Sequence, residues 1–170
     1  VVQIDAHSDL AAYMEGEEHH HGNFMSRAVG LDHITGIHQV GIRGITPVPQ
    51  TRAGGKVRQS LTPGMLRRHG VAAFLEALPA DRSYYVTLDI DALDPGFAPG
   101  TSTPLPGGLT FEEVKALLTG IATSRACAGF DLVEVNPERD LNDITAITAL
   151  ELVLTFLGAH FRRRKEEGSI

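Results

Sequence analysis

The chain has 170 residues and a formal net charge of −6, and 42% of its residues are hydrophobic. This composition suits one globular domain that buries a core, whereas the negative charge argues against a nucleic-acid partner. The single cysteine, Cys127, excludes an internal disulfide and favours a buried thiol in a reducing, cytoplasmic setting. We judge no apolar stretch long enough to span a bilayer, so we also expect no membrane partner.

Strand-forming and helix-forming stretches alternate along the chain. Strands are expected at residues 1–5, 37–43, 84–89 and 129–135, and helices at 24–29, 63–78, from 110 onward, and at 144–161. Thr62 before Pro63, and Thr110 three residues before Glu113, are helix-start signals. The glycine-rich stretch 52–59 is interpreted as a loop. Because the strands are apolar at nearly every position, the pattern predicts a single α/β domain over residues 1–170, with a parallel sheet covered on both faces.

Acidic residues collect where two of the expected strands end. The sequence DAHSD spaces Asp5, His7 and Asp9 two residues apart, and DID does the same for Asp89 and Asp91. Alternate side chains of an extended chain share one face, and the carboxyl ends of parallel strands meet at one edge of the sheet. Either motif alone is more often a pair of solvated acids, but the two together favour a metal site. Four carboxylates and one imidazole suit manganese, with magnesium, iron or zinc as alternatives, and are enough for two adjacent ions that activate a shared water.

Four longer motifs carry a resemblance. In chain order they are IDAHSD, HGNF, VTLDIDALDPGFAPGTSTPLPGGLT and FDLVEVNPERD. They resemble the ureohydrolases, the arginase and agmatinase family, and agmatinase most of all. The resemblance implies a three-layer α/β fold of the arginase/deacetylase type with a parallel sheet. The chain opens at Val1 inside the first expected strand, so we expect it to be the C-terminal portion of that fold.

The resemblance also implies a cofactor and an assembly. It implies two manganese ions per subunit, held by Asp5, His7, Asp9, Asp89 and Asp91. A sixth ligand, a histidine in a GGDH-like motif, is expected upstream, and this chain contains no such motif. A homo-oligomer, trimeric or hexameric, and a role in polyamine metabolism are implied as well.

Roles for individual residues follow from the same resemblance. Catalytic roles are implied for Asp91 and His21, which would pass a proton to the departing amine, and for Glu134, which would hold the substrate's guanidinium. Asp131 is either a second substrate-binding acid or a structural residue of its strand. Thr103 either lines the substrate site or shapes a turn.

The implied reaction is hydrolysis of a linear amidine or guanidino compound to urea and an amine. No acid follows QVGIRG to recognise an α-amino group, which favours agmatine over arginine and leaves guanidinobutyrate and formimidoylglutamate as alternatives. Arg43, at the end of that strand, is expected to be an ion-pair partner rather than a catalyst. Three other functions remain open: a zinc deacetylase of the same fold, a magnesium–phosphate site, and a non-catalytic module with a structural or assembly role.

Overall fold

The computed structural model describes residues 1–12, 19–45 and 55–168. One sheet of five parallel strands runs through the centre of the molecule, in the order β3-β2-β1-β4-β5. The strands are β1 (Val2–Ile4), β2 (Ile37–Val40), β3 (Val57–Leu61), β4 (Ser83–Asp89) and β5 (Ala126–Val133).

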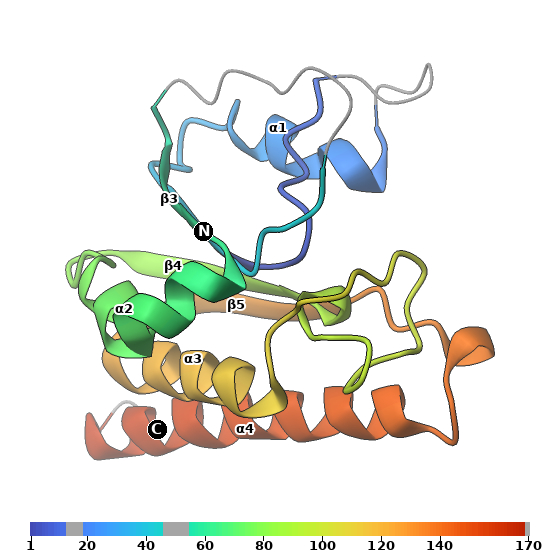
Figure 1. Ribbon diagram of the computed structural model, residues 1–170. Coiled ribbons are helices and arrows are strands. Elements are labelled where there is room, and N and C mark those ends of the chain that lie inside the picture. Colours follow the sequence, from blue (N-terminus) through green and yellow to red (C-terminus); the bar gives the residue numbers. More distant parts are fainter. Residues whose placement is uncertain (13–18, 46–54, 169–170) are drawn as a thin grey trace.

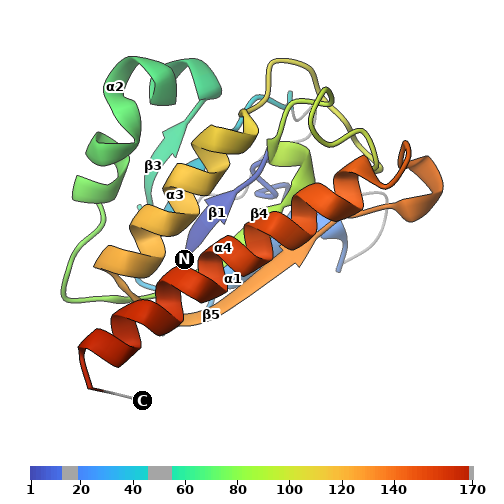
Figure 2. The same ribbon diagram turned by 90° about the horizontal axis from the view of Figure 1, so that it is seen from below.

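Helices lie on both sides of this sheet (Figure 1). They are α1 (Phe24–Ala28), α2 (Pro63–Glu76), α3 (Phe111–Ser124) and α4 (Ile144–Glu166), with short 3-10 helices η1 (His21–Asn23), η2 (Ile90–Ala92) and η3 (Pro137–Arg139). The three longer helices cover one face, where α3 and α4 run side by side (Figure 2). The short helix α1 lies on the other face. The predicted α/β fold with a parallel sheet is therefore confirmed.

The main core lies between the sheet and the three longer helices. Alternate residues of β1, Val2 and Ile4, and of β4, Val86 and Leu88, point into it and are fully buried. A smaller cluster of Leu10, Met25, Val29 and Ile37 forms beneath α1 on the opposite face. Since successive strand residues point to opposite faces, this packing fixes which side chains of β1 and β4 face away from the main core.

Most of the expected elements are present, with shifted ends. Thr62 caps α2, and Thr110 with Glu113 forms the expected capping box of α3. The second strand ends at Val40 rather than at residue 43, because the chain turns at Gly41 with a positive φ of 102°. Helix α2 is interrupted at Gly70, whose φ is 83°.

Two expectations, about the stretch 52–59 and about Cys127, were wrong. Part of the stretch 52–59, interpreted as a loop, belongs to β3, an edge strand whose residues alternate between half-buried and exposed. Cys127 is half-buried on β5 rather than fully buried, and burial against the main core raises the pKa of its thiol.

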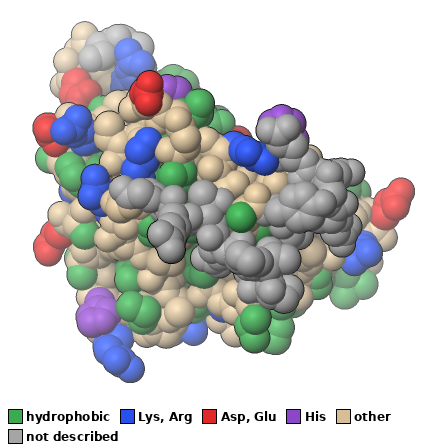
Figure 3. All heavy atoms as spheres, turned by 90° about the horizontal axis from the view of Figure 1, so that it is seen from above, with side chains coloured by type: hydrophobic (Ala, Val, Ile, Leu, Met, Phe, Trp, Pro, Cys, Tyr) green, Lys and Arg blue, Asp and Glu red, His purple; other side chains and the backbone are tan. Residues whose placement is uncertain are grey.

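The outer surface carries an apolar stripe along α4. Its residues repeat at intervals of three and four and remain exposed: Ile147, Leu150, Leu154, Leu157 and Phe161. By length and hydropathy alone α4 could cross a membrane, so the expectation that no stretch is long enough was wrong. One such helix is weak evidence, because core helices of soluble proteins pass the same test. On the face shown in Figure 3, described side chains of both charge signs are scattered rather than grouped.

Candidate metal centre

The candidate site lies where β1 and β4 end. These strands are parallel neighbours, and Ile4 pairs with Leu88, so Asp5 and Asp89 leave the sheet side by side. The chain proceeds outward from β1 to β2 and β3 on one side, and from β4 to β5 on the other. In open parallel sheets, ligands bind outside the carboxyl ends of the strands at such a reversal of order.

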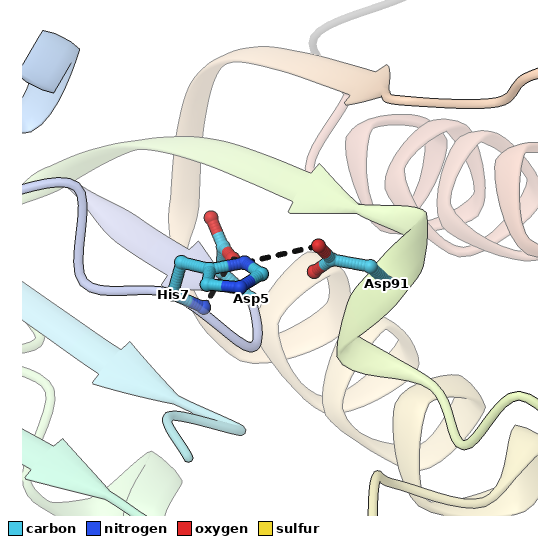
Figure 4. A group of neighbouring side chains, drawn as sticks. All are labelled: Asp5, His7 and Asp91. Carbon is cyan, nitrogen blue, oxygen red and sulfur yellow. Dashed lines mark hydrogen bonds and ion pairs between the residues drawn. The ribbon is translucent and has the colours of Figure 1, made fainter. Parts of the chain in front are cut away.

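Three of the predicted ligands already form a close group. One ligand atom each from Asp5, His7 and Asp91 lie within 4.8 Å of one another. His7 Nδ1 is 3.0 Å from Asp91 Oδ2 and 3.7 Å from Asp5 Oδ1, and Figure 4 shows the imidazole between the two carboxylates. Asp5 and Asp91 are buried, whereas His7 is partly exposed, so the group is open on one side.

The two other predicted ligands border this group. Burial, followed by repulsion from Asp5, raises the pKa of Asp9 from its ordinary 3.8 to about 9. Burial and repulsion from Asp5 and Asp91 raise the pKa of Asp89 to about 10. The pKa of Asp5 is raised too, mainly by burial. These carboxylates are close enough to oppose one another's ionisation, which is the electrostatic situation that a bound cation relieves.

His7 offsets part of this crowding. The neighbouring carboxylates of Asp5 and Asp91 raise the pKa of the imidazole to about 10. Burial opposes ionisation of Asp91, but the hydrogen bond and charge of His7 outweigh it and lower the pKa of that carboxyl below 3.8. In the metal-free protein, this raised pKa favours a protonated imidazole among the carboxylates at neutral pH. Divalent cations displace such protons when they bind, because metal ligands must be deprotonated.

Backbone amides and one hydroxyl orient the carboxylates. His7 N donates to Asp5 Oδ1 at 2.6 Å, and Asp91 N donates to Asp89 Oδ1 at 2.8 Å. Asp91 accepts from Ala6 N at 3.2 Å through Oδ1 and from Thr103 Oγ1 at 3.0 Å through Oδ2. The first and second acidic motifs are therefore joined directly. The atoms that could bind a metal ion here are carboxylate oxygens and imidazole nitrogens. This set of ligand atoms fits manganese or a similar hard or borderline divalent cation.

Sequence reasoning missed two glutamines that support the site. Gln3 Nε2 donates to Asp5 Oδ2 at 2.8 Å and to Asp9 Oδ2 at 3.1 Å. Gln39, its cross-strand partner on β2, donates to Gln3 Oε1 at 2.7 Å. Both side chains are buried on the face away from the main core. An amide within the otherwise apolar VVQI was the available signal, because a buried polar group needs a partner.

Two glycines let the backbone approach the site closely. A Cβ at Gly44 would lie 2.7 Å from His7 Cδ2, and one at Gly41 would lie 2.8 Å from the carbonyl oxygen of Asp5. The chain leaving β2 is thus packed directly against the DAHSD segment.

The remaining predicted residues are distributed around this edge. Val133 pairs with Asp89, so Glu134 follows β5 at the same edge of the sheet, with a left-handed φ of 64°. Asp131 lies two positions inside the strand, where its Oδ2 accepts a hydrogen bond from Tyr85 Oη at 2.7 Å. His21 opens η1, is exposed, and lies against the ring of His20, outside the close group described above.

The expectation for Arg43 needs correction. In the part of the chain that the structure describes, its guanidinium donates to backbone carbonyl oxygens at hydrogen-bond distance, not to a carboxylate. Arg43 is therefore a link between loops rather than half of an ion pair.

The chain is similar to known proteins over most of its length. The sequence profile of the arginase family matches residues 1–158 of this chain. Proclavaminate amidinohydrolase of Streptomyces clavuligerus is 36% identical over an alignment of 174 positions, which covers 98% of this chain and 55% of that protein. An agmatinase of Cronobacter sakazakii is 37% identical over 166 residues, covering 92% of this chain and 50% of that one. The chain thus spans about half the length of the curated relatives it matches.

Solved structures agree with the sequence comparisons. The structure of the Streptomyces clavuligerus proclavaminate amidinohydrolase matches with a TM-score of 0.85 and 37% identity, over 95% of this chain and 56% of that one. Agmatine ureohydrolase of Thermoplasma volcanium matches with a TM-score of 0.82 and 28% identity, over 98% of this chain and 56% of that one. The resemblance in the sequence motifs is therefore confirmed, and the chain belongs to the arginase family.

Proposed function

We propose that this protein is a binuclear manganese hydrolase that cleaves a linear guanidino compound, agmatine or a close analogue, to urea and an amine. The observation that carries the proposal is the convergence of Asp5, His7 and Asp91 at the β1–β4 edge, bordered by Asp9 and Asp89. Relatives named agmatinase and proclavaminate amidinohydrolase support a guanidino substrate.

In this proposal, Asp5, His7, Asp9, Asp89 and Asp91 hold the ions. The ions, when bound, supply a water of lowered pKa as the nucleophile and polarise the guanidino group. Gln3 keeps Asp5 and Asp9 in one orientation, since it donates to both. Outer residues of this kind typically change metal affinity 10–100-fold when they are removed.

Glu134 is proposed to hold the substrate. Its position just beyond β5 places it at the same sheet edge as the ligands from β4. A carboxylate binds a guanidinium through paired, charge-assisted hydrogen bonds, which also fix its orientation. Asp131 is a second candidate, although its hydrogen bond with Tyr85 favours the structural interpretation. Thr103 borders the site through Asp91.

Proton transfer completes the proposed reaction. Water adds its oxygen to the guanidino carbon, the bond from carbon to the substituted nitrogen breaks, and that nitrogen leaves as an amine that needs a proton. Asp91 is proposed to pass on this proton and exposed His21 to exchange it with solvent, because an imidazole can both accept and donate a proton.

An assay of product release with metal analysis tests the proposal. The protein is stripped with a chelator, reloaded with Mn²⁺, and supplied with agmatine, arginine, guanidinobutyrate or formimidoylglutamate. We expect two ions per chain and urea release from agmatine that disappears after stripping. Asp91→Asn should abolish release, whereas Asp81→Asn, an exposed acid beside Arg82, should not. One zinc without urea would indicate the deacetylase alternative, and no bound metal would indicate a non-catalytic module.

We further propose that the protein is a homo-oligomer in the cytoplasm. The exposed apolar stripe of α4, spaced as in helices that pack on other helices, supports association. Light scattering coupled to size exclusion tests this: a monomeric mass at micromolar concentration would reject it.

A further inference from the structure

Arg43 connects three loops beside the metal centre. Its Nη2 donates to the carbonyl oxygens of Asp91 at 2.8 Å, Leu93 at 3.2 Å and Leu105 at 2.7 Å. Its Nη1 donates to those of Gly41 and Ala92, both at 3.2 Å, and its Nε to that of Pro106 at 3.2 Å. One guanidinium thus holds residues 91–93, residues 105–106 and the end of β2.

The backbone of the same residue holds the other acidic motif. Arg43 N donates to the carbonyl oxygen of Ala6 at 2.8 Å, and Ala6 lies between the ligands Asp5 and His7. The two ligand-bearing segments, residues 4–9 and 89–93, are therefore both attached to Arg43: the first through its main chain and the second through its side chain.

The number of acceptors explains why arginine is needed here. Guanidinium offers five N–H donors in a fixed plane, whereas a lysine ammonium offers three around a single point. Six carbonyl oxygens lie within reach of the Arg43 guanidinium, so lysine would leave several of them without their donor. Carbonyl oxygens also balance the half-buried positive charge, since each directs the negative end of its dipole at the guanidinium.

The link extends to the carboxylate of Asp91. The segment held through Leu105 and Pro106 begins just after Thr103, whose hydroxyl donates to Asp91 Oδ2. Arg43 thus restrains Asp91 directly through its carbonyl group and indirectly through Thr103.

We propose that Arg43 is a positioning residue that sets the spacing between the two ligand-bearing segments and thereby the affinity of the site for divalent cations. This inference rests on the proposed function only in taking the acidic cluster to be a metal site. The Arg43 guanidinium donates only to backbone carbonyl oxygens among the described residues, so it is proposed to act through the ligand segments and not as a ligand.

The test compares Arg43→Lys and Arg43→Ala with the unchanged protein. Arg67→Met is the matched control, because Arg67 also joins two elements, through Glu113 and the Gly108 carbonyl. These partners lie outside the two ligand-bearing segments, residues 4–9 and 89–93. Mn²⁺ affinity is measured from the electron paramagnetic resonance signal of the free ion. We expect about 10–100-fold weaker binding in both Arg43 variants, little change in Arg67→Met, and partial recovery of Arg43→Ala with added ethylguanidinium. Recovery by a free guanidinium would not occur if the variant had simply lost its fold.

A second measurement needs no metal. Amide hydrogen exchange at His7 and Asp91 in the metal-free protein should be faster in Arg43→Lys than in Arg67→Met. Unchanged exchange at both amides, or native Mn²⁺ affinity in folded Arg43→Lys, would overturn the inference. If the unchanged protein binds no Mn²⁺, the proposed function fails, while the exchange data still decide whether Arg43 holds the two segments together.

Discussion

Replacing Gly44 by alanine tests whether the position of His7 determines metal binding. The added methyl group would lie 2.7 Å from His7 Cδ2 and 3.3 Å from Nε2, where ordinary contacts begin near 3.4 Å. Gly44 does not have a positive φ, so alanine fits the backbone and the conflict is confined to the imidazole. Because His7 is partly exposed, its ring can move outward instead of forcing the fold apart.

The size of the effect follows from this overlap. The imidazole must move by about 0.7 Å to restore ordinary contact, whereas metal–ligand distances tolerate only about 0.2 Å. A misplaced ligand of this kind should weaken Mn²⁺ binding roughly 10–100-fold, or about 1.4 to 2.7 kcal/mol. The free energy of unfolding of the metal-free protein should change by less, because a partly exposed ring relieves the contact.

Isothermal titration with Mn²⁺ and urea denaturation of the metal-free protein measure the two quantities. Gly64→Ala is the control, since its methyl group would meet only Thr62 Oγ1 at 3.9 Å in the first turn of α2. That variant should bind Mn²⁺ normally. Native Mn²⁺ affinity in Gly44→Ala would refute the reasoning, as would a loss of stability larger than the loss of affinity.

Three further outcomes are expected. Asp9 and Asp89, with pKa values raised from 3.8 to about 9 and about 10, keep protons in the fold that the unfolded chain loses above pH 4. The free energy of unfolding of the metal-free protein should therefore fall between pH 5 and pH 8, and saturating Mn²⁺ should remove that fall; denaturant titrations showing a rise would contradict it. Thr103→Val removes the hydroxyl that donates to Asp91 and should lower kcat/KM about tenfold, whereas a residue that only shapes a turn would leave kinetics unchanged. Phe156→Ala, which removes a buried ring 4.2 Å from that of Phe130, should cost about 3–5 kcal/mol in urea denaturation, while Leu31→Ala, at an exposed position outside the α4 stripe, should cost little.

The sequence predicted the parts of this fold that carry strong periodic signals. Asp5, His7 and Asp91 were predicted to converge because parallel strands end at one edge, and they do. The edge strand β3 escaped prediction because an edge strand need not be apolar throughout. Its residues VRQSL are mostly polar and follow a glycine-rich stretch, which in the sequence alone is typical of a loop. The structure shows that they alternate between half-buried and exposed positions, as in an edge strand.

Other features depended on contacts between distant segments. Gln3 and Gln39 support the site through a cross-strand pairing that requires knowing that β1 lies beside β2. The carbonyl groups around Arg43 carry no sequence signal at all, since every residue has one. A sequence shows which side chains are available, but not which backbone atoms they will meet.

The pairing of β1 with β4 has a consequence for how the protein matures. Ala6 and Asp91, which touch in the finished structure, are 85 positions apart in the chain. Parallel strands so distant in sequence associate late, because a long loop must close before any contact rewards it. During synthesis the DAHSD segment is therefore made well before the DID segment with which it pairs. Binding of the proposed ions would therefore follow the pairing of these strands rather than start it.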